Sequence, residues 1–361
     1  LNEADASRTQ NILNIDARIG LYHDLEVFAT IPIVIGDQTD LTFPAGVDGS
    51  NSTLMPTGKP TLFKMPNNGR KRSGLGDVSV GLRYAPLAQW RDRHYPTLQL
   101  AFTYTMPSGT LRRANNSGVS NGHHQLRFDI IGSRRIKFIE PYVGLFGNLR
   151  LPASTTLFQN YGSTQNRTNP SPDLGLVLGT EFFPWDDARP DGKKGRYFSM
   201  DVGFSALYTF QGRNYTDVFE ALGASTCGTS QDPQCTLTTY TRTLENDASP
   251  AIRRMDGITE TAPFGTFSTW AGFNLQPIEY VKLSFRFTYS RETAHHLTYA
   301  DVGQDLDGGI PGGEAGVNYT NSLGQNEYNP VDASEIDDPG KRLKSEGANI
   351  FGIMLMLTGK Y

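Results

Sequence analysis

The chain has 361 residues, a formal net charge of -4 at pH 7 and a mean hydropathy of -0.41. No apolar run approaches the roughly 18 residues that a membrane helix needs, which excludes a helical membrane protein, and the near balance of charge gives no indication of nucleic-acid binding. The 38 glycines, 20 phenylalanines and 16 tyrosines instead suit strands that expose every second side chain to lipid.

Apolar and polar residues alternate along most of the chain, as in a strand with one face toward lipid and the other toward water. Leu98, Leu100 and Phe102, for example, alternate with Gln99 and Ala101. A soluble β-sandwich also alternates, but its strands are usually about 5 or 6 residues long, whereas many of these segments match the roughly 9 to 11 residues of a tilted membrane crossing. The pattern covers 13–21, 25–35, 76–85, 97–106, 125–131, 139–150, 174–183, 198–208, 267–276, 281–291 and 348–361.

The connections alternate between short and long. Tight links lie at 22–24, 133–137 and 276–280, with moderate ones at 86–95 and 185–196. In bacterial barrels short turns face the periplasm and long loops face outside. We therefore predict a single domain, 1–361, that is an all-β, transmembrane, antiparallel up-and-down barrel in the outer membrane of a Gram-negative bacterium. Its long extracellular loops are 37–73, 107–122, 152–172, 211–263 and 292–346.

Strand parity adds an expectation about the N-terminus. Single-chain bacterial barrels have an even number of strands, with both ends in the periplasm. The strand at 13–21 leads into a short turn, so it descends, and residues 1–10 are expected to be the tail of an outer loop. We therefore expect an ascending strand before Leu1, giving about twelve strands, of which about eleven are visible.

The C-terminal segment is predicted to carry an assembly signal. Phe351, Ile353, Leu355 and Leu357 alternate toward lipid, and the chain ends on Tyr361. This pattern resembles the terminal strand that the outer-membrane barrel assembly machinery recognises. The partners expected from the sequence are therefore this machinery, outer-membrane lipids and lipopolysaccharide, together with proteins that bind the outer loops.

A family resemblance is carried by Gly-Leu-Gly-Asp-Val-Ser-Val-Gly-Leu-Arg-Tyr at 74–84 and by the preceding hairpin at 11–33. These segments resemble the fourth, second and third crossings of the meta-pathway phenol degradation transporter family of outer-membrane barrels. The resemblance covers about the first 150 residues. It implies a strand before the hairpin, and it implies transport of hydrophobic or aromatic solutes.

The function depends on the residues that alternate away from lipid. Their charges are of both signs, which is compatible with a narrow polar channel that orients a solute, and equally with side chains that pair across the interior and plug it. The candidates for lining the lumen are Asp16, Arg18, Glu26, Asp77, Arg83, Arg127, Asp129, Glu140, Arg150, Glu181, Asp201, Lys282 and Arg286.

Three other kinds of site were weighed. Cys227 and Cys235 are predicted to form a local disulfide that stiffens the outer loop 211–263. Asp301, Asp305 and Asp307 form a weak calcium candidate, because the spacing of an EF-hand is not met. Ser120 and the histidines at 123–124 have residue types of a hydrolase, but not the order found in barrel phospholipases. We expect no enzyme activity, no cofactor and no other metal site.

Two functions therefore follow from the sequence. The first is an outer-membrane channel or transporter that passes small solutes through a narrow polar lumen. The second is a non-conducting barrel that anchors a surface or trans-envelope complex through its long outer loops.

Overall fold

The computed structural model describes residues 2–52, 65–113, 116–152, 169–188, 194–223, 259–298 and 343–359. These residues form two antiparallel sheets and one short helix. The elements are β1 (Asp5–Tyr22), β2 (Leu25–Thr42), β3 (Asn67–Asn68), β4 (Arg72–Leu75), β5 (Ser79–Leu87), β6 (Thr97–Thr105), β7 (His123–Ser133), β8 (Ile139–Pro152), β9 (Asp173–Ala188), β10 (Lys194–Thr209), β11 (Gly212–Arg213), α1 (Phe219–Gly223), β12 (Glu260–Thr261), β13 (Phe264–Ile278), β14 (Val281–Glu292), β15 (His295–Thr298), β16 (Leu343–Ser345) and β17 (Asn349–Gly359).

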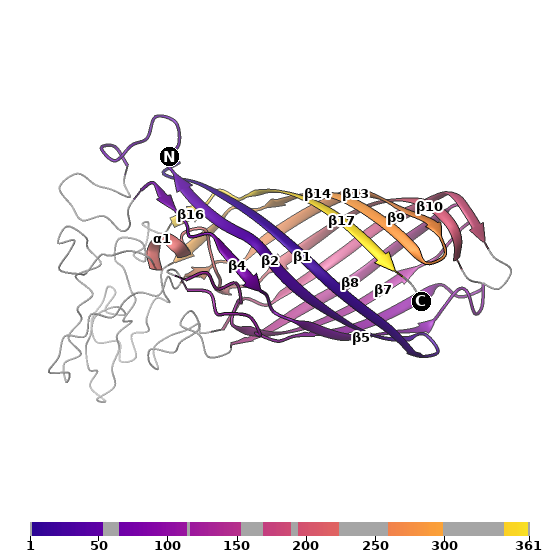
Figure 1. The fold of residues 1–361 in the computed structure, drawn as a ribbon. Helices are drawn as coiled ribbons and strands as arrows, with labels where there is room; N and C mark the ends of the chain where they lie inside the picture. Colours follow the sequence, from indigo (N-terminus) through magenta and orange to yellow (C-terminus); the bar gives the residue numbers. More distant parts are fainter. Residues whose placement is uncertain are drawn as a thin grey trace, which may run out of the picture.

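The large sheet is a curled half-barrel of long, oblique strands (Figure 1). Its order is β1-β2-β5-β6-β7-β8-β9-β10-β13-β14-β17, so neighbours along this path follow chain order, and β3 and β4 pair with β2 beside it. This confirms the predicted all-β, antiparallel, up-and-down architecture with eleven visible strands. Among the described residues β1 and β17 are the two edges of the sheet. The expected twelfth strand lies outside the structure and stays a prediction.

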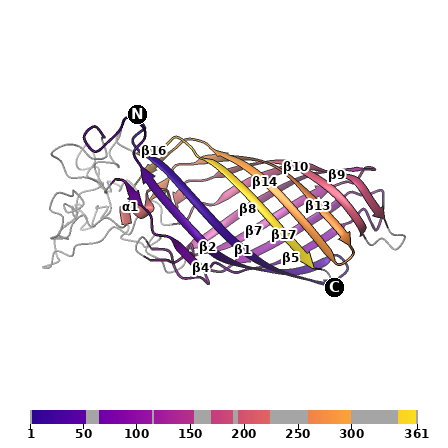
Figure 2. The ribbon, with the colours of Figure 1, turned by 45° about the horizontal axis from the view of Figure 1, so that its top comes forward.

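The two ends of the half-barrel differ, as a view turned by 45° also shows (Figure 2). Tight turns join β1 to β2, β7 to β8 and β13 to β14 at one end, which we call the turn end. The N-terminus, α1 and β16 lie at the opposite end, which we call the loop end (Figure 1). The three tight connections expected from the sequence are therefore present.

The first hairpin is longer than the alternating pattern predicts. Residues 1–10 were expected in a loop, yet β1 begins at Asp5 and pairs with β2 as far as Thr42. The expected loop 37–73 likewise gives its first residues to β2 and contains β3 and β4. The reason is that apolar alternation marks only the part of a strand that faces lipid, whereas backbone pairing continues into polar sequence beyond it.

The long segments toward the loop end also hold secondary structure. The predicted loop 211–263 contains β11, α1 and β12, and the predicted loop 292–346 contains β15 and β16. β11, β12, β15 and β16 pair in that order into a second, four-stranded sheet. Among the described residues, no helix has the length and apolar character that crossing a membrane requires.

Candidate channel lumen and outer mouth

The large sheet has one apolar and one polar face. Phe351, Ile353, Leu355 and Leu357 on β17 are all strongly exposed, like the apolar residues that alternate along the other strands. On the opposite face, side chains two strands apart reach each other, as Tyr142 on β8 and Asp201 on β10 do. Such contacts identify the polar face as the concave one. The alternation expected of the C-terminal strand is present, its use as an assembly signal stays a prediction, and Tyr361 lies outside the described residues.

The charged residues singled out from the sequence lie along this concave face or at its rim. Arg18 faces Phe28 across β1 and β2, and Asp16 accepts a hydrogen bond of 2.6 Å from the Thr30 hydroxyl. Asp77 lies just before β5 and accepts bonds from the backbone N–H groups of 109 and 121, at 3.3 and 3.0 Å. Their contribution to a conducting path stays a prediction.

Most of the other candidates form ion pairs or hydrogen bonds within the wall. The ion pairs are Arg83–Glu26 at 2.7 Å, Arg127–Asp129 at 2.7 Å, Arg286–Asp201 at 3.0 Å, and Arg150 with Asp173, a carboxylate that the sequence did not single out. Glu140 accepts a bond of 2.9 Å from Ser133, and Glu181 accepts bonds from Ser199 and Asn274. Lys282 lies on the same face near the turn end. Because nearly every partner is on the same or a nearby strand, these charges stay against the wall.

Asp201 is the most heavily bonded of these carboxylates. It accepts hydrogen bonds from the Tyr142 hydroxyl at 2.8 Å, the Trp270 indole N–H at 2.8 Å and the Arg286 guanidinium at 3.0 Å. These donors come from β8, β13 and β14, on both sides of β10. Three donors, one of them cationic, therefore bond to the two oxygens of this carboxylate. The cluster therefore fixes the positions of two aromatic rings and one arginine on the concave face.

Four aromatic rings on this face lie flat over glycines of the neighbouring strand. The cross-strand pairs are Phe28–Gly81, Tyr142–Gly179, Phe146–Gly175 and Trp270–Gly203. A Cβ added at any of these glycines would lie 2.2 to 2.5 Å from an atom of its ring. Only glycine leaves this space. The rings thus cover the wall rather than project into the interior.

Sequence reasoning missed these rings, because it assigned only polar residues to the concave face. The pattern that would predict such a ring is an aromatic residue on the polar face of one strand, directly opposite a glycine on the neighbouring strand. That signal requires the register between two strands, which one strand alone does not contain.

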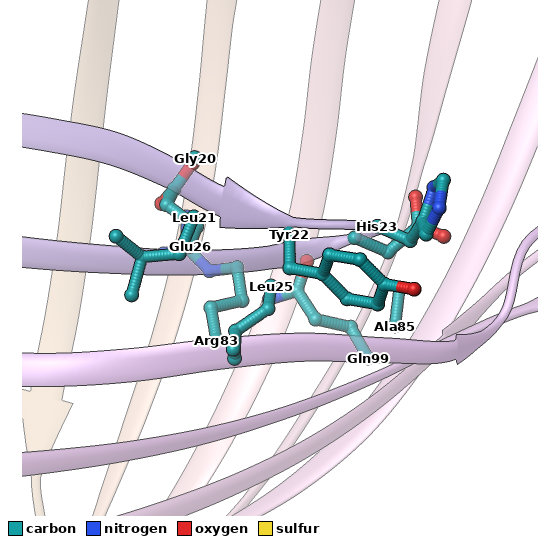
Figure 3. A pocket seen from close by; sticks show the side chains of 10 residues that line it. Gly20, Leu21, Tyr22, His23, Leu25, Glu26, Arg83, Ala85 and Gln99 are labelled. Carbon is teal, nitrogen blue, oxygen red and sulfur yellow. The ribbon is translucent and has the colours of Figure 1, made fainter.

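A hollow of about 490 Å³ opens at the turn end of the first hairpin (Figure 3). It is lined by residues of the β1–β2 turn, including Tyr22 and His23, and by the Arg83–Glu26 pair. Gln99 on β6 completes one side. Because Arg83 and Glu26 face the concave side of the sheet, this hollow lies at the turn end of the candidate lumen.

At the loop end, the segment 212–223 crosses from one part of the half-barrel to another. It follows β10, and Asn214 donates a hydrogen bond of 2.7 Å to Ser171, just before β9. Its α1 then reaches Arg72 on β4, which pairs with β2. Five strands, β5 to β9, lie between β2 and β10 in the sheet. The segment therefore crosses the opening of the curled sheet at the loop end, which we call the outer mouth.

A buried ion pair holds the far end of this segment. Arg72 Nε donates to Glu220 Oε1 at 2.8 Å, and both residues are buried. Arg72 also donates to the carbonyls of Arg113 and Gly118, both at 2.8 Å. Nearby, Asp37 pairs with Arg8 at 2.7 Å and with Arg112. The guanidinium of Arg72 thus joins α1 to the wall and to the loop between β6 and β7.

The remaining sequence candidates are placed as follows. Cys227, Cys235, Asp301, Asp305 and Asp307 lie outside the described residues, so the disulfide and the calcium candidate stay predictions. Buried Ser120 accepts a hydrogen bond from the backbone N–H of residue 122, and His124 bonds to the Tyr104 hydroxyl at 2.7 Å. Within the described part of the chain, no group of three His, Cys, Asp or Glu residues could hold a metal ion.

Comparisons with known proteins give one structural likeness to report. No protein-family model matches the chain. No curated protein matches it either. Among solved structures, the chain is similar to the crystal structure of the COG4313 outer membrane channel from Pseudomonas putida F1, with a TM-score of 0.39 and 14% sequence identity, over 80% of this chain and 78% of that chain.

Proposed function

We propose that this chain forms the wall of an outer-membrane channel for small solutes. The observation that carries the proposal is the separation of the two faces of the curled sheet. One face is apolar and exposed, which suits contact with lipid tails, and the other carries ion pairs and hydrogen-bonded polar groups, which suit a water-filled lumen. Because short turns face the periplasm in bacterial barrels, the turn end faces the periplasm and the loop end faces outside.

The outer mouth gives the proposed channel a constriction. The segment 212–223 crosses the loop end and is held there by Arg72. A channel with such a segment in place passes small solutes and has low conductance. Because the sequence resembles the meta-pathway family, hydrophobic or aromatic compounds are the solutes to test first.

The same constriction favours a second candidate function, a non-conducting barrel that anchors a surface or trans-envelope complex. A mouth crossed by a segment that a buried ion pair holds in place suits a barrel whose loops, rather than its lumen, perform the function. In that case the residues of the concave face serve stability alone.

Single-channel recording separates the two candidates. The full-length protein is refolded, inserted into a planar lipid bilayer and recorded beside a Cys227→Ser, Cys235→Ser variant. The channel predicts discrete current steps with reproducible conductance, and added aromatic solutes should block them in a concentration-dependent way. A correctly folded barrel that stays silent in both forms would contradict the channel and support the anchor.

A further inference from the structure

The ion pairs of the concave face present their arginines, rather than their carboxylates, to the interior. The side chain of Arg286 is 44% exposed against 10% for Asp201, Arg127 is 35% exposed against 14% for Asp129, and Arg150 is 20% exposed against 2% for Asp173. Arg83 and Glu26 are equally exposed. A passing solute therefore meets guanidinium groups at three of these four pairs.

In two of these three pairs, those of Arg127 and Arg286, an aromatic ring accounts for the exposed arginine. The guanidinium carbon of Arg127 lies 4.3 Å from the ring centre of Phe146, that of Arg286 lies 5.5 Å from Trp270, and that of Arg83 lies 5.2 Å from Phe28. Each ring lies flat on its glycine, so the guanidinium is lifted to the far side of the ring and toward the interior. The shorter aspartates are less exposed than their arginines. Asp201 also accepts bonds from Tyr142 and Trp270, and Asp173 accepts one from Asn148.

We infer that the lumen prefers anions to cations, and that Arg127 and Arg286, each stacked on a ring, are the residues that set this preference. The inference rests on the proposed channel function and names its solute class as small anions, organic or inorganic. The net charge of -4 would suggest the opposite. What acts on a solute, however, is the charge nearest its path, and recessed carboxylates act from farther away and are already hydrogen-bonded.

The acidic residues that lack a described arginine partner on this face do not reverse the argument. Glu181 is held by Ser199 and Asn274, and Glu140 by Ser133. Asp16 accepts a hydrogen bond from Thr30 and lies two residues from Arg18 on the same face of β1. These two glutamates face each other across β8 and β9 near the turn end, whereas Arg127 and Arg286 lie farther along their strands. The expected profile is therefore a cationic middle above a periplasmic entrance with charges of both signs, because Lys282 also lies near the turn end.

The test is the reversal potential of the full-length protein in a planar bilayer with a tenfold KCl gradient. The wild-type channel should be more permeable to chloride than to potassium. Arg127→Gln and Arg286→Gln should each lower the chloride-to-potassium permeability ratio by about four-fold. One unit charge about 10 Å away in water favours an anion about two-fold and disfavours a cation about two-fold. Asp129→Asn should raise the ratio, because it removes the carboxylate that offsets Arg127.

Arg196→Gln is the matched control. It removes one arginine from an ion pair with Asp187 near the connection between β9 and β10, away from the concave middle. It should leave the ratio unchanged. A conducting channel that prefers potassium, or whose ratio is the same in wild type, both arginine variants and Asp129→Asn, would overturn the inference while leaving the channel intact. Absence of any conductance would instead overturn the proposed function.

Discussion

The ion pairs of the concave face, which we also call the lumen wall, and those of the outer mouth use the same residue types in different surroundings. In the wall, Arg127 and Arg286 are partly exposed, and their aspartates are recessed. At the mouth, Arg72 and Glu220 are both buried, and the two residues lie 148 positions apart in the sequence. Exposed pairs contribute little to stability, whereas removing one partner of a buried pair leaves an uncompensated charge. The wall pairs are therefore suited to selectivity, and the mouth pair to holding a segment in place.

The largest effect that would test this difference is expected from Arg72→Met. The variant leaves Glu220 buried without its cationic partner, which typically costs about 3 to 5 kcal/mol. We expect the segment 212–223 to leave the outer mouth, so that its backbone amides exchange faster with solvent and single-channel conductance rises.

The double variant Arg72→Met, Glu220→Leu is the control for this change. It removes both charges and retains apolar volume, so exchange protection should largely return. If Arg72→Met alone leaves both exchange and conductance unchanged, the ion pair does not hold the segment.

A smaller effect is expected from Gly203→Ala in the wall. The added methyl group would lie 2.2 Å from Cζ2 of Trp270, so the ring must move and its bond to Asp201 must lengthen. Overpacking of this kind costs about 1 to 3 kcal/mol. The midpoint of urea unfolding in detergent should fall accordingly.

Gly352→Ala on β17 is the matched control for the ring–glycine contact. Its Cβ would have Thr288 Cβ as nearest neighbour at 3.7 Å, an ordinary contact. Equal midpoints for the two variants would show that the ring does not depend on the glycine beneath it.

The same contrast explains which parts of the protein the sequence could predict. The apolar face was predictable because a sheet with one apolar face has a period of two in each strand separately. The rings over glycines were not, because Trp270 and Gly203 have meaning only as a cross-strand pair. The outer mouth was also missed. The helix α1 is too short to show a periodic pattern, and Arg72 and Glu220 are too far apart in sequence for a local motif to indicate their pairing.

The smallest effect concerns pH at the outer mouth. Burial raises the pKa of Glu220, and the nearby Arg72 guanidinium offsets this only in part. A carboxyl whose pKa is higher when docked binds its proton more tightly in the docked state. Its contribution to docking is therefore fully present below its undocked pKa and is lost as the pH rises through the docked pKa.

Conductance should accordingly fall as the pH is lowered through this range, because protonation of Glu220 strengthens docking of the segment 212–223. Glu220→Gln should weaken the dependence, since an amide does not titrate there. Burial also raises the pKa of Asp217 in the same segment, so a smaller dependence of the same sign should remain. Asp48→Asn, at an exposed aspartate with no ion-pair partner among the described residues, should leave it as in wild type. A conductance that rises on acidification in wild type would mean that loss of the Arg72 ion pair outweighs relief of the buried charge. In that case the charges of Arg72 and Glu220 attract each other strongly enough to hold the segment. The mouth pair would then differ from the pairs of the concave face only in that its arginine is buried.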